Sequence, residues 1–376
     1  MKILIDLLSF YMYNYTVYSI LVCISFSCVF SDPYEQLDVD FLKNKKKSTQ
    51  VSKKAAIEKK KNKLPAYNEI IKAYEKIEGM FDFYWDKEKN KLLLSLAPEN
   101  FTQNYIQNIT RQSGDAYYYG GPSMLYEFPF TFKQVGDKIQ LIHINVLFRA
   151  DEDRAISKAV ENDFSNSIVA TTQILSSPSK ENEAILIDAN KLFIRDIGYV
   201  SQHRKGKYTF DYKNSYFLDI KSFVYNSELE ISAQYKSNKF TNSYTLPNSR
   251  SMEIKYHISI STLIDNDYMP RKVDDRIGYF STIFQDYTNT LQETQYVRYI
   301  NRWNLVKKDP YAKISEPVQP IVYWIENTVP EEFRGAIKDG IEAWNLAFEN
   351  IGFKNAIIAK QMPDDADWDP ADSRYS

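Results

Sequence analysis

The stretch Glu228-Leu229-Glu230-Ile231-Ser232-Ala233-Gln234-Tyr235 decides the fold class of this chain. Polar and apolar residues alternate strictly along it, and a period of two is typical of a β-strand with one buried and one solvated face. A second strand-like run at 215–224 precedes it, and Tyr225-Asn226-Ser227 between the runs predicts a turn. The sequence therefore predicts a hairpin over 217–235 in a half-exposed antiparallel sheet.

Strand signals surround this hairpin from residue 99 to residue 266, which we predict to be one β-rich domain. The chain contains 29 Tyr and 22 Phe, which favour pleated, half-buried surfaces. One helix is predicted to interrupt the sheet, because Ile156, Val160 and Phe164 recur every four residues after an acidic start. Further strands are predicted at 140–148, 184–194, 207–212 and 252–263.

A smaller unit is predicted at 65–98. Pro65 begins a predicted helix that Gly79 ends, and strand-like runs at 80–85 and 91–96 predict a hairpin. The apolar face of the helix is predicted to consist of Tyr67, Ile70, Ile71, Tyr74 and Ile77. The length of 376 residues exceeds the ~250 to 300 residues at which single cores stop growing, so several domains are expected.

The N-terminus indicates the compartment. Residues 7–31 carry no formal charge, and Ser25 and Ser27 suit a signal cleavage before Cys28. A cleaved signal peptide is predicted, with an uncleaved membrane anchor or an ordinary buried helix as alternatives. The two cysteines, Cys23 and Cys28, both lie in this segment, so the mature chain has no disulfide framework and no thiolate for a metal or for catalysis.

A lysine-rich run follows at 43–63, with ten lysines against Glu58 alone. It lacks an apolar period and interleaved aromatics, so it predicts a solvated linker, with attraction to an anionic surface as the alternative. The net charge of −2 gives no general attraction to nucleic acid or to anionic membranes. No nucleic-acid partner is therefore expected.

A β-helix-β pattern is predicted near the C-terminus. Strand-like runs at 320–325 and 356–359 flank a helix that begins at Pro330 and ends before Gly352. This order predicts a parallel strand pair with a helical crossover. The helix should bury one continuous stripe made of Phe333, Ile337, Ile341, Trp344 and Phe348.

Charged residues flank this pattern on both sides. At 271–276, two arginines and two aspartates predict an ion-pair cluster at a domain junction. The run 364–372 holds five aspartates, but Pro370 occupies the place of the glycine that a calcium loop requires. A solvated acidic loop is predicted there.

Six blocks, taken in order and spacing, resemble a family of bacterial exported zinc-dependent metalloproteases with a metzincin-like catalytic domain. These blocks are Met269-Pro270-Arg271-Lys272-Val273-Asp274-Asp275-Arg276-Ile277-Gly278-Tyr279-Phe280, Arg298-Tyr299-Ile300-Asn301-Arg302-Trp303, Pro320-Ile321-Val322-Tyr323-Trp324-Ile325, the run 340–349, the run 352–357 and the run 367–375. The resemblance covers about 65–376, diffusely in the β-rich part and specifically after Met269. It implies peptide hydrolysis by a zinc-bound water in the full-length family, on a helix carrying His-Glu-x-x-His.

That motif does not occur in this sequence. The histidines are His143, His203 and His257, too far apart in sequence for two to lie one turn apart on a helix. No catalytic, cofactor-binding or metal-binding residue is therefore assigned. We expect this chain to be inactive alone, with zinc and a peptide or protein substrate belonging to the full-length family.

The expected fold class is α+β, in a protein exported to the periplasm, the cell envelope or the medium. Membrane attachment through residues 7–31 is the variant expected if the signal is not cleaved, which would leave a membrane-anchored, inhibitor-like remnant. The alternative function is a non-enzymatic exported β-rich module that binds peptide or glycan. The predicted segments are 1–31 (signal peptide or anchor), 32–64 (Lys-rich linker), 65–98 (helix-hairpin domain), 99–266 (β-rich domain), 267–317 (connecting region) and 318–376 (incomplete start of a metalloprotease-like domain).

Overall fold

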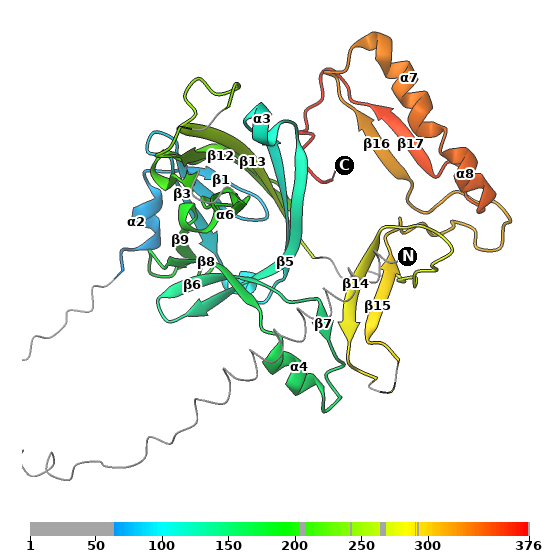
Figure 1. The fold of residues 1–376 in the computed structure, drawn as a ribbon, viewed down its shortest axis with the longest axis horizontal. Helices are drawn as coiled ribbons and strands as arrows, with labels where there is room; N and C mark the ends of the chain where they lie inside the picture. Colours follow the sequence, from blue (N-terminus) through cyan, green and yellow to red (C-terminus); the bar gives the residue numbers. More distant parts are fainter. Residues whose placement is uncertain are drawn as a thin grey trace, which may run out of the picture. The chain divides into compact units, whose positions relative to one another are not determined.

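A computed structural model gives the fold (Figure 1). It describes residues 64–203, 208–240, 243–263, 268–289, 291 and 293–374. The predicted signal peptide or anchor, and all of the predicted linker except Leu64, lie outside the described residues. Among the described residues, no helix is long and apolar enough to cross a membrane.

The structure is α+β, as the sequence predicts. The helices are α2 (Tyr67–Ile71), η2 (Pro98–Phe101), α3 (Ala116–Tyr119), α4 (Ser157–Asp163), α5 (Asn190–Phe193), α6 (Val200–His203), η3 (Tyr212–Asn214), α7 (Glu331–Glu342) and α8 (Asn345–Asn350). The strands are β1 (Glu75–Ile77), β2 (Phe83–Asp86), β3 (Lys91–Leu96), β4 (Tyr105–Ser113), β5 (Ser123–Val135), β6 (Lys138–His143), β7 (Phe148–Arg149), β8 (Ser167–Gln173), β9 (Ile185–Asp188), β10 (Thr209–Phe210), β11 (Tyr216–Ser222), β12 (Asn226–Lys236), β13 (Ser251–Thr262), β14 (Ser281–Asp286), β15 (Tyr296–Ile300), β16 (Ile321–Ile325) and β17 (Ile357–Gln361).

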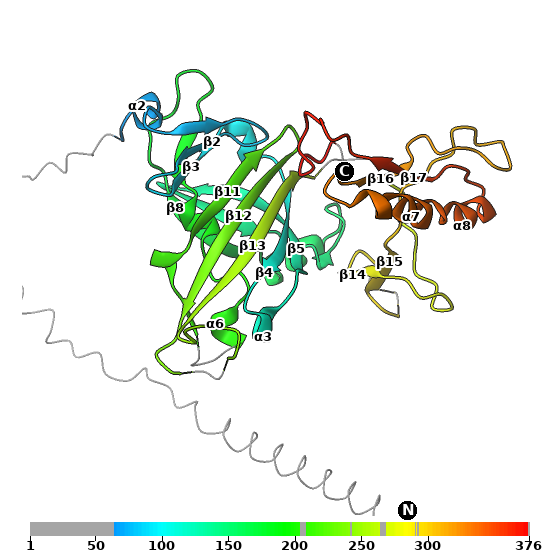
Figure 2. The same ribbon diagram turned by 90° about the horizontal axis from the view of Figure 1, so that it is seen from above.

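The largest element is an eight-stranded antiparallel sheet with the strand order β10-β12-β13-β4-β5-β6-β8, in which β11 also pairs with β12. The predicted hairpin is confirmed: β11 and β12 pair from Tyr216↔Ser232 to Ser222↔Ser227. Figure 2 shows the long strands β12 and β13 side by side. Alternate residues of β13 are buried, from Met252 to Ile260, because the period of two places them on the inner face.

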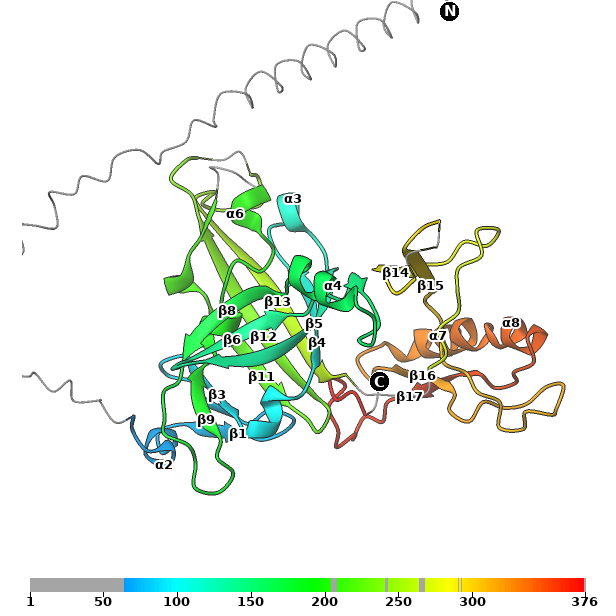
Figure 3. The same cartoon turned by 90° about the horizontal axis from the view of Figure 1, so that it is seen from below.

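A second sheet, β1-β2-β3-β9, packs against the inner face of the first and shares its hydrophobic core. Its strand β9 pairs with β3, as Leu93↔Asp188 to Leu96↔Ile185 (Figure 3). The core includes Phe83 and Leu94 from this sheet together with Ile258 from the large one. Strand pairs and a shared hydrophobic core therefore join residues on both sides of residue 98, where the sequence predicts a domain boundary.

Two predicted elements end earlier than expected. The helix predicted to begin at Pro65 and to be ended by Gly79 stops at Ile71, because Glu75–Ile77 instead pairs with β2 and brings Ile77 against the core. The strand predicted over 184–194 ends at Asp188, whose carboxylate accepts the Asn190 N–H at 3.0 Å. An aspartate acceptor two residues before a turn favours helical backbone over strand, and α5 follows. The predicted helix at 156–164 is confirmed as α4.

The C-terminal part contains the predicted β-helix-β unit. β16 and β17 pair in parallel, from Ile321↔Ile357 to Ile325↔Gln361. The connecting helix is interrupted at Ala343 and Trp344, so α7 and α8 replace the single predicted helix. The prediction that this helix buries a continuous apolar stripe is wrong. Among the described residues, neither α7 nor α8 buries a side chain, and Phe333 and Trp344 are more than half exposed.

Candidate functional site

The face of β12 that the sequence predicts to be solvated is largely covered. Glu228 is 5% exposed and Ser232 is fully buried, while Glu230 and Gln234 are half-buried. Neighbouring polar groups explain this burial, because Ser232 donates to Glu253 at 2.6 Å and Glu230 accepts from Gln112 at 3.0 Å. The prediction of a wet face is therefore wrong, and the face carries a buried polar network.

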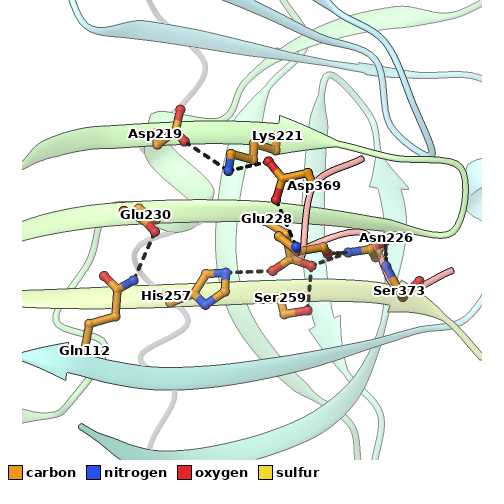
Figure 4. A network of polar contacts seen from close by, with 11 residues as sticks. Gln112, Asp219, Lys221, Asn226, Glu228, Glu230, His257, Ser259, Asp369 and Ser373 are labelled. Atoms are coloured by element: carbon orange, nitrogen blue, oxygen red, sulfur yellow. Dashed lines mark hydrogen bonds and ion pairs between the residues drawn. The ribbon is translucent and has the colours of Figure 1, made fainter. Parts of the chain in front are cut away.

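The centre of this network is the Glu228 cluster, defined here as Asn226, Glu228, His257 and Ser259 (Figure 4). The Glu228 Oε1 atom accepts hydrogen bonds from Asn226 Nδ2 at 2.5 Å and from Ser259 Oγ at 2.8 Å. His257 Nε2 lies 2.7 Å from Glu228 Oε2. Oε2 accepts no well-directed hydrogen bond, so the contact with His257 is mainly one of charge. A buried carboxylate needs such partners, because burying an isolated charge is costly.

The sequence register brings these residues together. Asn226 and Glu228 lie two positions apart on β12, so their side chains share one face. On the neighbouring strand β13, Ser259 lies directly opposite Glu228, and His257 lies opposite Glu230 and diagonal to Glu228. Cross-strand neighbours at these positions are within side-chain reach.

Residues 369–374, the tail segment, lie on this cluster. Asn226 Nδ2 also donates to the Ala371 carbonyl at 2.7 Å, and Asn226 Oδ1 accepts the Ser373 N–H at 3.0 Å. A second anchor comes from β11, where Lys221 Nζ lies 2.7 Å from the Asp369 carboxylate. The prediction of a solvated acidic loop is therefore wrong for this part of the tail, since these contacts hold it on the sheet.

One aspartate of the tail is itself buried. Asp372 is 2% exposed and pairs with Arg374 at 2.5 Å. The Asp372 N–H donates to the Asp369 carbonyl at 2.9 Å, which closes a turn at Pro370. The tail is thus a folded turn with its charges paired inside the chain.

Charge contacts shift the pKa values of this network. The Glu228 carboxylate, 2.7 Å from Nε2, raises the pKa of His257 above its usual value, although burial opposes it. Contact with Asp369 raises the pKa of Lys221. Burial raises the pKa of Asp369, but the hydrogen bonds from Lys221 and the Ala371 N–H outweigh it, so that pKa lies below its usual range. Hydrogen bonds from Arg374 lower the pKa of Asp372. Lys221, Asp369 and Asp372 therefore stay charged near neutral pH, and the contact with Glu228 favours the protonated form of His257.

The other two histidines lie elsewhere. His143 is at the end of β6 with its ring 4.5 Å from the Phe128 ring, and burial lowers its pKa. His203 is exposed at the end of α6. Among the described residues, no group of three His, Cys, Asp or Glu is placed to hold a metal ion.

The predicted ion-pair cluster at 271–276 forms two separate pairs. Arg276 pairs with Asp274 at 2.5 Å, and Arg298 of β15 pairs with Asp275 at 2.7 Å. The paired side chains are largely exposed, so these pairs contribute little to stability. The Arg271 carbonyl accepts the Ile300 N–H at 3.0 Å.

A cleft of about 710 Å³ lies beside β16. It is lined by Trp303, Asn304, Leu305, Gln319, Pro320, Ile321, Val322, Trp324, Lys360 and Arg374. The Trp324 ring packs against Trp368 at 5.1 Å, and Lys360 Nζ lies 5.3 Å from the Trp324 ring centre. Aromatic walls with few polar groups are typical of ligand clefts.

Comparison with known proteins gives one family match. Residues 123–308 match the family described as "Domain of unknown function (DUF5117)", which is slightly less than half of the chain. Searches of curated proteins and of solved structures gave no match. The matched range includes β12 and β13, and so the whole Glu228 cluster, but neither the tail segment nor the unit from β16 to β17.

Proposed function

We propose that this chain is the N-terminal, non-catalytic part of an exported zinc-dependent metalloprotease that hydrolyses peptides or proteins. The parallel unit of β16, α7, α8 and β17 carries the proposal, because this order agrees with the start of a metzincin-like domain that the resemblance implies. The blocks after Met269 lead into this unit in the order of the family.

The unburied helix stripe is a second support. Domains are built from at least two packed layers, and the exposed side chains Phe333, Ile337 and Trp344 have no second layer among the described residues. In the proposed full-length protein, further polypeptide covers them. The described residues do not fit a catalytic zinc, so no step of the reaction is assigned to them.

In this proposal the β-rich region is a scaffold. Its hairpin of β11 and β12 holds the tail segment, which lies a few residues after the end of β17 at Gln361. The scaffold thereby fixes the polypeptide at the point where it leaves the α/β unit.

Metal content and peptidase activity test the proposal. We expect the 376-residue chain to hold no stoichiometric zinc after dialysis and to cleave no peptide, because a catalytic zinc needs three protein ligands and an open position. The reading frame after the Ser376 codon is sequenced in parallel, and a longer chain carrying His-Glu-x-x-His should bind one zinc and cleave peptides. One tightly bound zinc in the shorter chain, or a downstream sequence without that motif, contradicts the proposal.

The runner-up function is an exported non-enzymatic binding module. The cleft beside β16 favours it, because Trp303 and Trp324 offer apolar and stacking surface to a peptide or glycan. Titration of the chain with peptides and oligosaccharides, followed by tryptophan fluorescence, separates the two. Saturable binding that Trp303→Ala abolishes, together with an absent downstream motif, supports the module.

A further inference from the structure

One amide group carries both backbone contacts between the large sheet and the middle of the tail segment. The Asn226 side chain donates to the Ala371 carbonyl and accepts from the Ser373 N–H, so a single orientation of the amide serves both contacts. Asn226 is 2% exposed. A flipped amide would place two acceptors against each other at Ala371 and two donors against each other at Ser373.

The Glu228 carboxylate fixes this orientation. Its Oε1 atom lies 2.5 Å from Asn226 Nδ2, and a carboxylate accepts hydrogen bonds but does not donate them. The NH₂ group of Asn226 must therefore face Glu228, which leaves Oδ1 free to accept from Ser373. The buried carboxylate thus acts on the tail through the Asn226 side chain.

His257 is the charge that compensates this carboxylate. Among the described residues, the other charged groups around His257 are Glu230 on β12 and Lys221 on β11, and Lys221 is bound to Asp369. Asp219 lies 3.9 Å from Lys221, and in the tail Asp372 is paired with Arg374. His257 is the member of this group that ordinarily titrates between pH 5 and 8.

We propose that Glu228 and His257 form a proton-dependent clamp that holds residues 371–373 on β12 through Asn226. With His257 protonated, the carboxylate is compensated, Asn226 is held in one orientation and the tail is bound. With His257 neutral, the buried carboxylate loses its counter-charge and the tail detaches more readily.

The sign of the pH dependence follows from the direction of the shift. The pKa of His257 is raised in the folded chain, so the stabilisation is fully present below the usual histidine pKa of about 6.5. It is lost as the pH rises through the raised pKa. The pKa values of Asp369 and Asp372 are lowered and that of Lys221 is raised, so these groups keep their charges across this range.

Hydrogen exchange of the tail amides, corrected for the intrinsic pH dependence of exchange, tests the clamp. In the whole chain we expect protection of residues 371–374 to fall about tenfold from pH 5.5 to pH 9, the size expected when one partly buried ion pair loses its charge. His257→Gln should give the low protection at both pH values. His257→Arg, which keeps the charge, should give high protection at both.

Two variants distinguish pH-dependent release of the clamp from a general loosening of the tail segment. Lys221→Met removes the other anchor, so it should lower protection at both pH values and leave the ratio between them unchanged. His203→Gln, at an exposed position on α6, should behave as the unmodified chain. Protection that does not change with pH, or that changes equally in His257→Arg, overturns the proposal.

Discussion

At the scale of single residues, close approach of two backbones makes one glycine necessary. A Cβ atom on Gly79 would lie 2.5 Å from the Ser222 carbonyl carbon and 2.7 Å from the Phe223 nitrogen. The neighbouring Met80 N–H donates to the Phe223 carbonyl, which holds this turn against the end of β11. A side chain at position 79 therefore collides with backbone, which cannot rotate away.

We predict that Gly79→Ala lowers the free energy of unfolding by about 2 to 3 kcal/mol, the usual cost of forcing extra volume into a packed site. Urea unfolding monitored by fluorescence measures it. The matched control is Gly278→Ala, where a Cβ atom meets nothing within 4 Å, and its effect should stay within about 0.5 kcal/mol. Equal effects of the two substitutions would contradict the close approach.

The sequence predicts the positions of side chains on a strand better than their surroundings. Alternation along 228–235 correctly places Leu229 and Ile231 in the core. It cannot reveal that Glu228 is buried, because its partner His257 comes from another strand and the tail segment comes about 140 residues later. The Glu228 cluster therefore had only one sequence signal, a histidine on the polar face of a strand.

At the scale of elements, α7 and α8 are held by few contacts. Their apolar side chains lie mostly outward, whereas Ile321 and Ile325 of β16 are buried. The parallel strand pair was predictable because its apolar runs are short and flank a helix of sufficient length. The break between α7 and α8 at Ala343 and Trp344 was not predictable from the sequence, since the apolar stripe continues across it without interruption.

We predict that replacing both Phe333 and Trp344 with Lys changes the free energy of unfolding by less than about 0.5 kcal/mol, because both side chains are exposed and Lys favours helix. The double variant should also bind less of an apolar dye and associate less with itself, as measured by dye fluorescence and sedimentation. Ile325→Lys, at a buried position, is the control and should destabilise the unit strongly. Marked destabilisation by the double variant would show that the stripe is packed.

At the scale of the whole molecule, burial is uneven along the chain. One core cluster draws its residues from Phe81 to Ile260 and joins both large sheets. Among the described residues beyond 307 the buried apolar residues are few, namely Ile321, Ile325, Ala356, Ile357, Ala359 and Met362. Regions with few buried apolar contacts open at lower free energy than core strands.

Limited proteolysis should therefore cut first between residues 307 and 374, while the β-rich core from 99 to 263 survives. Mass spectrometry of the early fragments identifies the sites. Equal resistance of both regions would show that residues 307–374 are covered by another part of the chain.

Because some paired strands are far apart in the sequence, a strand that is synthesised early must wait for its later partner. β3 ends at Leu96, but its neighbour β9 begins at Ile185, and β4 needs β13, which ends at Thr262. At ~5 to 20 residues per second, roughly 10 to 30 seconds separate the emergence of Leu96 from that of Thr262. During this interval β3 can pair with β2 and β4 with β5, but the edge of β3 that meets β9 and the edge of β4 that meets β13 stay unpaired until those strands emerge. A slow codon before residue 262 lengthens that exposure, whereas one after it does not.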